Sequence, residues 1–260
     1  MLAAAIAVPA GVCARPRPRF EPTDLEWEET GVFEADVEFG AVRSPGPWRA
    51  VIADFELDFG VLPNVEVGVD GAYAIEGPTL GGFSLDHGVV YPLWLSAKIG
   101  LYDDHDDLTG RARAVGIQIG PKLPIAAGSR GLGGEALLIF GGSRRGLTVA
   151  VNLGAFIEPA PDVVTPRQTG AEGGIDLELQ LDSRDRFQLT GELAGATFIS
   201  NDPTQLHATA GLTWSATQTL DVSVVGIVGF LPGDDHYGIL FGVEPKLRVF
   251  EASPRDKQGP

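Results

Sequence analysis

The sequence predicts an all-β protein: a single antiparallel, up-and-down transmembrane β-barrel of about 12 strands. Three observations support this fold class. Apolar and polar residues alternate with period 2 through almost the whole chain, and helical periodicity is hard to find. Most alternating runs last ten to thirteen residues, whereas strands in soluble sheets average about 5–6 residues and a tilted membrane-spanning strand needs about 9–11. The 35 glycines and 19 prolines interrupt the chain often, as many turns require.

Composition excludes several classes of protein. The chain of 260 residues has 19 Lys+Arg against 35 Asp+Glu, a net charge of -16, so it has no basic footprint for nucleic acid. Beyond the N-terminus no apolar stretch reaches the roughly 20 residues of a membrane helix. Cys13 is the single cysteine, which rules out an internal disulfide and a cysteine-based metal site.

The N-terminal region is expected to precede the barrel. The apolar run from Leu2 to Ala14 is typical of a secretory signal, although its usual basic start is missing, so the start is misplaced or the true N-terminus lies upstream. Lipidation at Cys13 and a disordered start are the alternatives. The predicted organisation is residues 1–14 as signal peptide, 15–27 as an unstructured lead-in, 28–250 as the outer-membrane barrel and 251–260 as a polar tail.

Twelve alternating runs make up the predicted barrel, and an even number is usual for single-chain bacterial barrels. The eighth run has the cleanest alternation, and the sixth the weakest, because Leu137 and Ile139 fall on its otherwise polar face. In chain order the runs are Thr30–Val42, Ala50–Val61, Val65–Tyr73, Val89–Leu101, Val115–Lys122, Gly133–Gly142, Leu147–Ile157, Ala171–Leu181, Phe187–Ile199, Gln205–Trp214, Leu220–Phe230 and Tyr237–Val249.

Short and long connections also alternate, as in outer-membrane barrels. If the N-terminus is periplasmic, the periplasmic turns are tight except Tyr102–Arg111, and the opposite side carries the longer Ala74–Gly88, Pro124–Leu132 and Pro159–Thr169. Aromatic residues near the run ends, including Trp48, Trp94 and Phe250, fit interfacial girdles.

A soluble β-sandwich also alternates apolar and polar residues, so the pattern alone does not decide between the two folds. The runs are too long for a sandwich, no weak run marks the edge of a sheet, and the polar face has many carboxylates but few lysines. In lipid every backbone polar group needs a partner within the sheet, so an apolar outer face implies closure. The sequence therefore favours a barrel in the bacterial outer membrane over a sandwich.

Short motifs in order along the chain resemble a known family. They are Phe59–Gly68, Leu95–Lys98, Gly120–Pro124, Asn152–Gly154, Phe187–Gly195 and Pro245–Phe250. On these the chain, from about Phe55 to Phe250, resembles the outer-membrane proteins named after the MetA pathway of phenol degradation. Where that family usually has Thr-Gly after Lys-Leu-Pro, this chain has Ile125-Ala126. The resemblance implies a transporter-like outer-membrane barrel and passage of small compounds, with aromatic compounds as one option, and it does not identify the substrate.

Carboxylates dominate the predicted interior. The acidic wall consists of Glu34, Asp36, Glu38, Asp54, Glu56, Asp58, Glu66, Asp70, Glu172, Asp176 and Glu178, and the basic lumen residues are Lys98, Lys122, Lys246 and Arg248. Closure of the last strand on the first would bring Lys246 and Arg248 near Glu34. Three interpretations stay open: a conduit for cations or polar solutes, a salt-bridge network that fills a narrow barrel, and divalent-cation binding. The metal status is unknown.

Catalysis has little support, so we predict no catalytic residue, no cofactor and no enzyme activity. His207 and Thr209 share a face, but no serine stands at a spacing that would complete a nucleophile-and-base pair. The Asp103–Asp107 turn is interpreted as a solvated acidic turn.

The leading hypothesis is a porin-like passive outer-membrane channel or transporter for small molecules, aromatic or cationic. The alternative is a plugged structural or adhesive barrel with its function in the outer loops, and a third hypothesis is a membrane-embedded hydrolase. The expected partners are the lipid bilayer, a small-molecule solute and, during biogenesis, the barrel-assembly machinery.

Overall fold

The computed structural model describes residues 22–44, 48–77, 88–106, 111–184, 186–199 and 202–250, and these residues form fourteen strands. The predicted signal peptide and C-terminal tail lie outside these ranges. The strands are β1 (Val32–Arg43), β2 (Trp48–Leu62), β3 (Val65–Glu76), β4 (Gly88–Val90), β5 (Leu93–Asp106), β6 (Arg111–Gly120), β7 (Lys122–Leu123), β8 (Gly134–Arg144), β9 (Leu147–Ile157), β10 (Thr169–Gln180), β11 (Phe187–Phe198), β12 (Gln205–Thr217), β13 (Leu220–Gly229) and β14 (Tyr237–Arg248).

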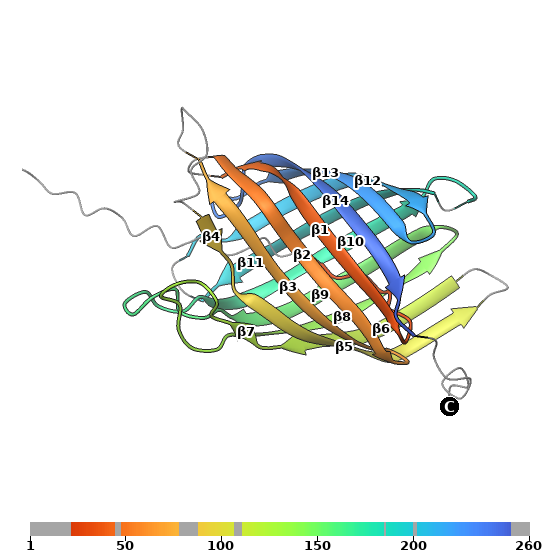
Figure 1. Ribbon diagram of the computed structural model, residues 1–260, viewed down its shortest axis with the longest axis horizontal. Helices are drawn as coiled ribbons and strands as arrows, with labels where there is room; N and C mark the ends of the chain where they lie inside the picture. The colour runs from red at the N-terminus through yellow and green to blue at the C-terminus, as the bar shows by residue number, and fades with distance from the viewer. Residues whose placement is uncertain are drawn as a thin grey trace, which may run out of the picture.

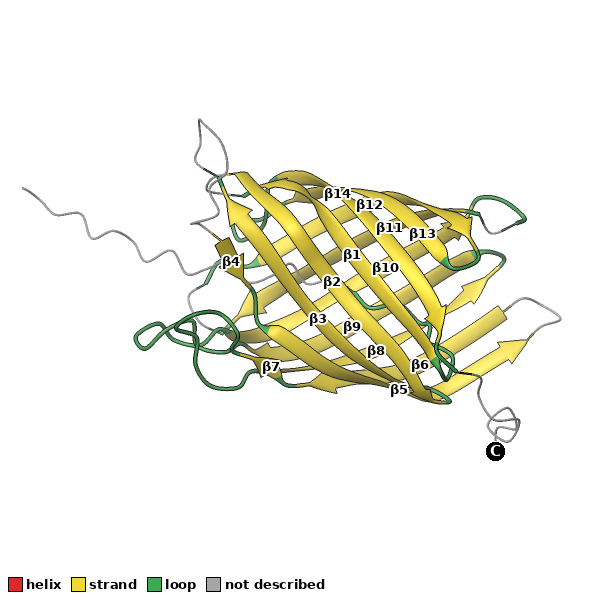
Figure 2. Cartoon of the chain, viewed as in Figure 1, coloured by secondary structure: helices red, strands yellow, loops and turns green. Residues whose placement is uncertain are grey.

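Twelve long strands close into a barrel (Figure 1), each antiparallel to its neighbours. The order around the barrel is β1-β2-β3-β5-β6-β8-β9-β10-β11-β12-β13-β14, and β14 returns to β1. The short β4 and β7 only extend the pairing of β3 and β5. Figure 2 shows strands and loops alone among the drawn elements, and no helix of the described residues is long and apolar enough to cross a membrane. The predicted twelve-stranded barrel is confirmed.

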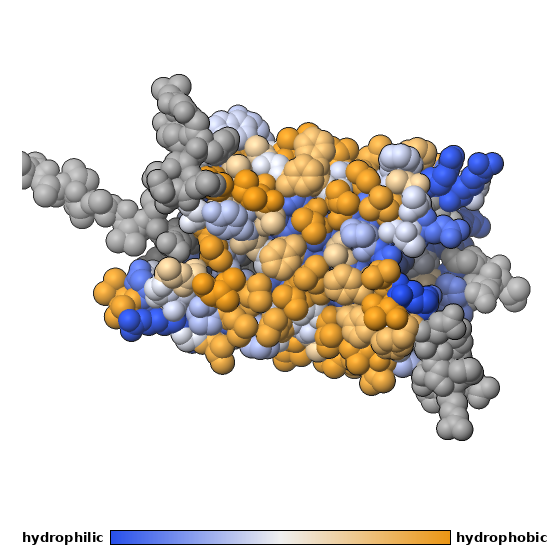
Figure 3. Space-filling view, viewed as in Figure 1, coloured by the Kyte–Doolittle hydropathy of each residue, from blue (hydrophilic) through white to orange (hydrophobic). Residues whose placement is uncertain are grey.

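The barrel is apolar outside and polar inside. Along β9 and β10 the outward positions are apolar and exposed, for example Leu153 (53%) and Ile175 (41%). The adjacent inward residues on the same strands, Asn152 and Asp176, are buried. Figure 3 shows apolar side chains gathered over the middle of the visible face and polar ones toward its ends. A soluble sandwich would bury the apolar face and expose the polar one, so the observed arrangement excludes it.

The two ends of the barrel differ. At the turn end, which holds the β2–β3 and β8–β9 connections and the last residue of β14, the turns are tight. Arg145 and Gly146 both have positive φ, as a two-residue hairpin turn requires. At the loop end, the segments 124–133 and 158–168 are longer and pair through an Arg130–Ala160 bridge (Figure 1, left).

A β-bulge overturns one detail of the prediction. The β2–β3 pairing shifts between Val51 and Ala53, so Ile52 is exposed and Val51 packs inside against Val42 and Leu240. The strict alternation expected from Ala50 had placed Val51 on the lipid face. An extra residue reverses the faces of everything before it, which also turns Arg49 inward.

Three predicted boundaries also differ. The expected Tyr102–Arg111 turn is wrong, because β5 continues to Asp106 and pairs with β6 from Arg111. The fourth run is split after Val90, and Tyr91 packs inside with Ala72 and Ala74 rather than facing lipid. The last strand ends at Arg248, just before Phe250, whose ring packs edge-on against Phe59 at 5.9 Å.

An arginine on the lipid face should strongly lower the free energy of unfolding only where it lies near the middle of the membrane. Ile175 lies midway along β10, so we expect Ile175→Arg to lower the free energy of unfolding by about 2–4 kcal/mol, and Leu147→Arg at the turn end of β9 by about 0–1 kcal/mol. Urea unfolding of protein folded into phospholipid vesicles measures both. Equal losses at the two positions would contradict a surrounding bilayer.

Candidate solute path in the barrel lumen

All eleven predicted acidic residues occupy the inward-facing positions of their strands, and none is exposed. Glu66, Glu172 and Asp176 are buried, and the other eight are half-buried. Eight of the eleven come from β1, β2 and β3, which lie side by side in the barrel wall. The remaining three, on β10, belong to the opposite part of the strand order, so the lumen has acidic groups on two sides.

Strand register brings the carboxylates of β1–β3 into direct rows. Asp36 pairs with Glu56, and Glu56 pairs with Asp70, so these three form one row across three adjacent strands. Glu38 pairs with Asp54 in the neighbouring row. Because adjacent strands are about 4.8 Å apart, the negative charges of one row lie very close to one another.

The predicted basic residues lie mainly on the flanks of this wall. Lys246 pairs in register with Glu34, and its Nζ lies 2.5 Å from that carboxylate and 3.2 Å from Glu244. Lys98 Nζ lies 2.7 Å from Asp24 and 4.0 Å from Glu66. Arg248 is at the turn-end rim, half exposed, with its guanidinium 2.5 Å from Glu29. Among the residues that the structure describes, no basic side chain forms an ion pair with the Asp36–Glu56–Asp70 row.

Near the loop end, Lys122 lies between two buried carboxylates. Its Nζ contacts Glu135 on the neighbouring β8 and lies 2.9 Å from Glu158, which follows β9. The same nitrogen is 5.8 Å from the centre of the Trp94 ring. This ion cluster ties the segment after β9 to the barrel wall, so Lys122 has a structural partner on each side.

His207 also holds a loop against the barrel. Its Nδ1 lies 2.9 Å from Asp234 in the β13–β14 connection, and the backbone N–H of Leu206 donates to the same carboxylate. The next residue, Asp235, accepts a hydrogen bond of 2.6 Å from Ser44 Oγ. Two successive aspartates therefore dock this loop at the mouth of the lumen.

The hydrolase hypothesis is not supported by these contacts. Thr209, the candidate nucleophile beside His207, donates its hydroxyl hydrogen bond to Glu192 at 2.9 Å. Within the described ranges, no group of three or more His, Cys, Asp or Glu side chains is arranged to hold a metal ion.

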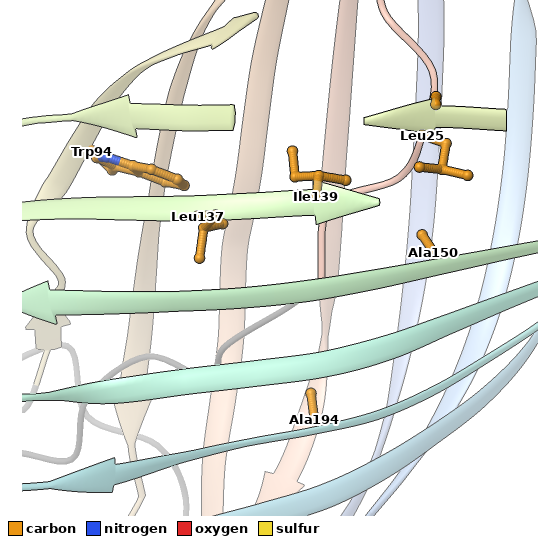
Figure 4. Close-up of a cluster of buried hydrophobic side chains, with 7 residues drawn as sticks. Leu25, Trp94, Leu137, Ile139, Ala150 and Ala194 are labelled. Atoms are coloured by element: carbon orange, nitrogen blue, oxygen red, sulfur yellow. The ribbon is translucent and has the colours of Figure 1, made fainter. Parts of the chain in front are cut away.

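The N-terminal lead-in enters the lumen. Residues 22–31 have no strand structure, but Leu25 is buried in a cluster with Leu137, Ile139 and Ala150 of the inner wall (Figure 4). Trp27 packs against the same cluster. The segment thus covers an apolar patch that would otherwise face the aqueous interior.

Glycines in the wall make room for this segment. A Cβ at Gly116 would lie 2.7 Å from a ring atom of Trp27, and one at Gly100 would lie 3.2 Å from the ring. Gly100 and Gly116 pair directly across β5 and β6, so the two glycines form a shallow surface for the indole.

Polar contacts complete the attachment of the lead-in. Asn152 Nδ2 donates to the Thr23 carbonyl at 2.8 Å, and the backbone N–H of Glu28 donates to Glu66 at 2.8 Å. With the Asp24–Lys98 ion pair, the segment is attached to β3, β5 and β9. It narrows the lumen between the acidic wall and the apolar patch.

Sequence reasoning missed the inner apolar patch and the buried amides Gln118 and Asn152. The signal for the patch was present, because Leu137 and Ile139 interrupt the polar face of the sixth run. Gln118 donates from Nε2 to Ser96 Oγ at 3.1 Å across the lumen face of β5 and β6. The amides carry no charge, so a search for ionisable groups passes over them.

Comparisons with known proteins reveal the fold but no family. No family model matches the sequence, and no curated protein sequence matches it. An outer membrane channel from Pseudomonas putida F1 superposes with a TM-score of 0.59 at 9% identity, covering 88% of this chain and 100% of that chain. The NanC porin superposes with a TM-score of 0.55 at 7% identity, covering 84% and 100%.

The chain therefore has the fold of bacterial outer-membrane barrels, as the sequence predicted. At identities this low the likeness establishes the fold alone. Membership of the MetA-pathway family stays a prediction.

Removing the cation from the Lys122 cluster should destabilise the barrel. Lys122→Met leaves two buried carboxylates without their cation, and we expect a loss of about 3–5 kcal/mol in the free energy of unfolding. The triple variant Lys122→Met, Glu135→Gln, Glu158→Gln should regain most of that loss. Urea unfolding measures both, and a triple variant no more stable than the single one would refute the ion-cluster interpretation.

Proposed function

We propose that this protein is a passive outer-membrane channel for small solutes with a preference for cations. The observation that carries the proposal is the Asp36–Glu56–Asp70 row, which faces the lumen without an ion-paired basic side chain among the described residues. Rings and rows of carboxylates select cations because they replace part of an ion's hydration and repel anions.

The distribution of charge supports the same proposal. Low-dielectric walls focus the field of a row of like charges into the lumen, which raises the local cation concentration. Lys98 and Lys246 are each matched by at least two carboxylates within 4.0 Å, so they cancel little of the field along the wall. The solved structures with this fold include proteins described as an outer membrane channel and a porin, and neither description is of an enzyme.

The finer assignments belong to the proposal as well. Small aromatic compounds are candidate solutes on the family resemblance, and such a solute would contact the inner apolar patch by displacing Leu25 and Trp27, which cover it. Export through a signal peptide and insertion by the barrel-assembly machinery follow from the proposed location.

The position of residues 22–31 favours a second candidate function, a plugged structural barrel. Leu25 and Trp27 lie inside the lumen, and the segment is attached at several points. A barrel filled in this way conducts little or nothing until the segment moves. Planar-bilayer recording separates the two candidates, because a steady current indicates a channel and silence from folded protein indicates a plug.

Neutralising the carboxylate row should reduce cation selectivity. We expect Asp36→Asn with Glu56→Gln to lower the cation-to-anion permeability ratio at least twofold, since two of the three row charges are lost. Reversal potentials in a potassium chloride gradient measure this ratio. The matched double variant Asp103→Asn, Asp104→Asn, on the exposed end of β5, should leave it unchanged; an equal effect in both pairs would contradict a path along the row.

Removing two side chains of the lead-in should widen the solute path through the lumen. We expect Leu25→Gly with Trp27→Gly to raise the single-channel conductance at least twofold, because both side chains stand between the acidic wall and the inner patch. Leu132→Gly with Val164→Gly removes two exposed apolar side chains from the loops and should not change the conductance. If Leu25→Gly with Trp27→Gly leaves the conductance unchanged, ions do not pass between the acidic wall and the inner patch.

A further inference from the structure

Two buried acceptor atoms on neighbouring strands have no hydrogen-bond partner among the described residues. Asp176 on β10 is 7% exposed and Asn152 on β9 is 0% exposed. Asp176 Oδ2 and Asn152 Oδ1 both lack a donor in the part of the chain that the structure describes. Buried polar atoms are nearly always satisfied in folded proteins, so both atoms call for a donor that the described residues do not supply.

The two atoms share one face of the inner wall. Asn152 pairs with Gly174, and Asp176 is the next inward residue along the same strand. Diagonal neighbours of this kind have α-carbons about 7–8 Å apart, with their β-carbons somewhat closer. Gly174 between them has no side chain, and Pro22 of the lead-in packs over it, so a small donor group that takes the place of Pro22 could reach both oxygens.

Negative charge is concentrated at the same place. Glu192 lies directly opposite Asp176 on β11, and one of its oxygens accepts the Thr209 hydroxyl. Among the described residues, no lysine or arginine forms an ion pair with Asp176 or Glu192, and Lys98, which contacts the lead-in, is 2.7 Å from Asp24. The donor that fits two facing carboxylates and an amide oxygen is therefore positively charged.

Apolar side chains flank the same acceptors on the other side. Ala150 lies opposite Asp176, Ile139 lies opposite Asn152, and Ala194 lies opposite Gly174. Figure 4 shows Ile139 and Ala150 near Leu25 of the lead-in and Ala194 farther along the inner wall, and all four belong to one buried apolar cluster. Pro22 covers Gly174, and the Thr23 carbonyl is bound by Asn152 Nδ2. The acceptors thus lie beside an apolar patch under the lead-in.

We propose that Asp176, Glu192 and Asn152 form a subsite for the ammonium group of a primary amine whose short apolar body replaces the lead-in on the Ile139–Ala150–Ala194 patch, which the lead-in covers in this structure. This inference deepens the proposed function by naming a substrate class. An ammonium group has several N–H donors directed to separate acceptors, and charge-assisted hydrogen bonds to carboxylates are stronger than neutral ones. A divalent metal ion fits less well, because it would need more oxygen ligands than this group offers.

Calorimetric titration of the detergent-solubilised, folded protein with n-butylammonium chloride tests the subsite. We expect saturable binding that weakens at least tenfold in Asp176→Asn. Tetramethylammonium, which has no N–H donor, and 1-butanol, which has no charge, should each bind at least tenfold more weakly than n-butylammonium. Asp103→Asn on the exposed end of β5 is the matched charge control and should bind like the unmodified protein.

Three results would overturn the subsite: no binding, equal binding of 1-butanol, or equal affinity in Asp176→Asn. Heat-modifiable mobility on gels confirms that each variant is folded. If Asp176→Asn does not fold, Asn152→Leu removes the other free acceptor, and affinity unchanged in that variant would equally refute the proposal. Water alone filling the site would show as absence of saturable binding.

The calorimetric readout does not depend on conduction. Binding that requires Asp176 in a protein without ionic current would sustain the subsite and overturn the channel. A cation-selective current without n-butylammonium binding would sustain the channel and overturn the subsite.

Discussion

Hydrogen bonding of the backbone in a medium without water is the constraint on which the whole structure depends. An unpaired strand edge in hydrocarbon leaves several N–H and C=O groups unsatisfied, so the pairing of Val32–Arg43 with Tyr237–Arg248 is as necessary as any other. That closure fixes which residues meet inside. It brings Lys246 against Glu34 although 212 positions separate them in the sequence (246 minus 34).

Strand pairing also explains why the carboxylates form a continuous acidic wall. Alternate residues of a strand face the same side, so a carboxylate at every second position of three successive strands forms rows once the register is set. The structure places the compensating lysines at Glu34 and Glu66, on the flanks, rather than within the Asp36–Glu56–Asp70 row. The lumen therefore combines a balanced, ion-paired region with a row of excess negative charge.

The alternation in the sequence was enough to predict strand number and the closure of the last strand on the first, because period 2 maps directly onto the two faces of a sheet. The predicted set of lumen carboxylates left out the buried Glu135, which lies in the run with the weakest alternation. The alternation could not predict the bulge at Ile52, since an extra residue leaves no mark in composition, and it therefore placed Val51 on the wrong face.

The alternation also could not predict where the lead-in lies. Trp27 and Leu25 lie inside because of Gly100, Gly116 and Ile139, residues scattered over three strands that only the folded barrel brings together.

The lead-in explains why apolar side chains can stand on the inner wall of the barrel. An exposed group of Leu137, Ile139 and Ala150 inside an aqueous lumen would be unfavourable, and burial under Leu25 removes much of that apolar surface from water. The same segment is held by an ion pair and backbone hydrogen bonds, which exchange readily with water or with a competing charge. If the protein is the channel we propose, a narrow path between a charged wall and a segment held in this way would select solutes by both charge and apolar surface, because each solute must replace one kind of contact or the other.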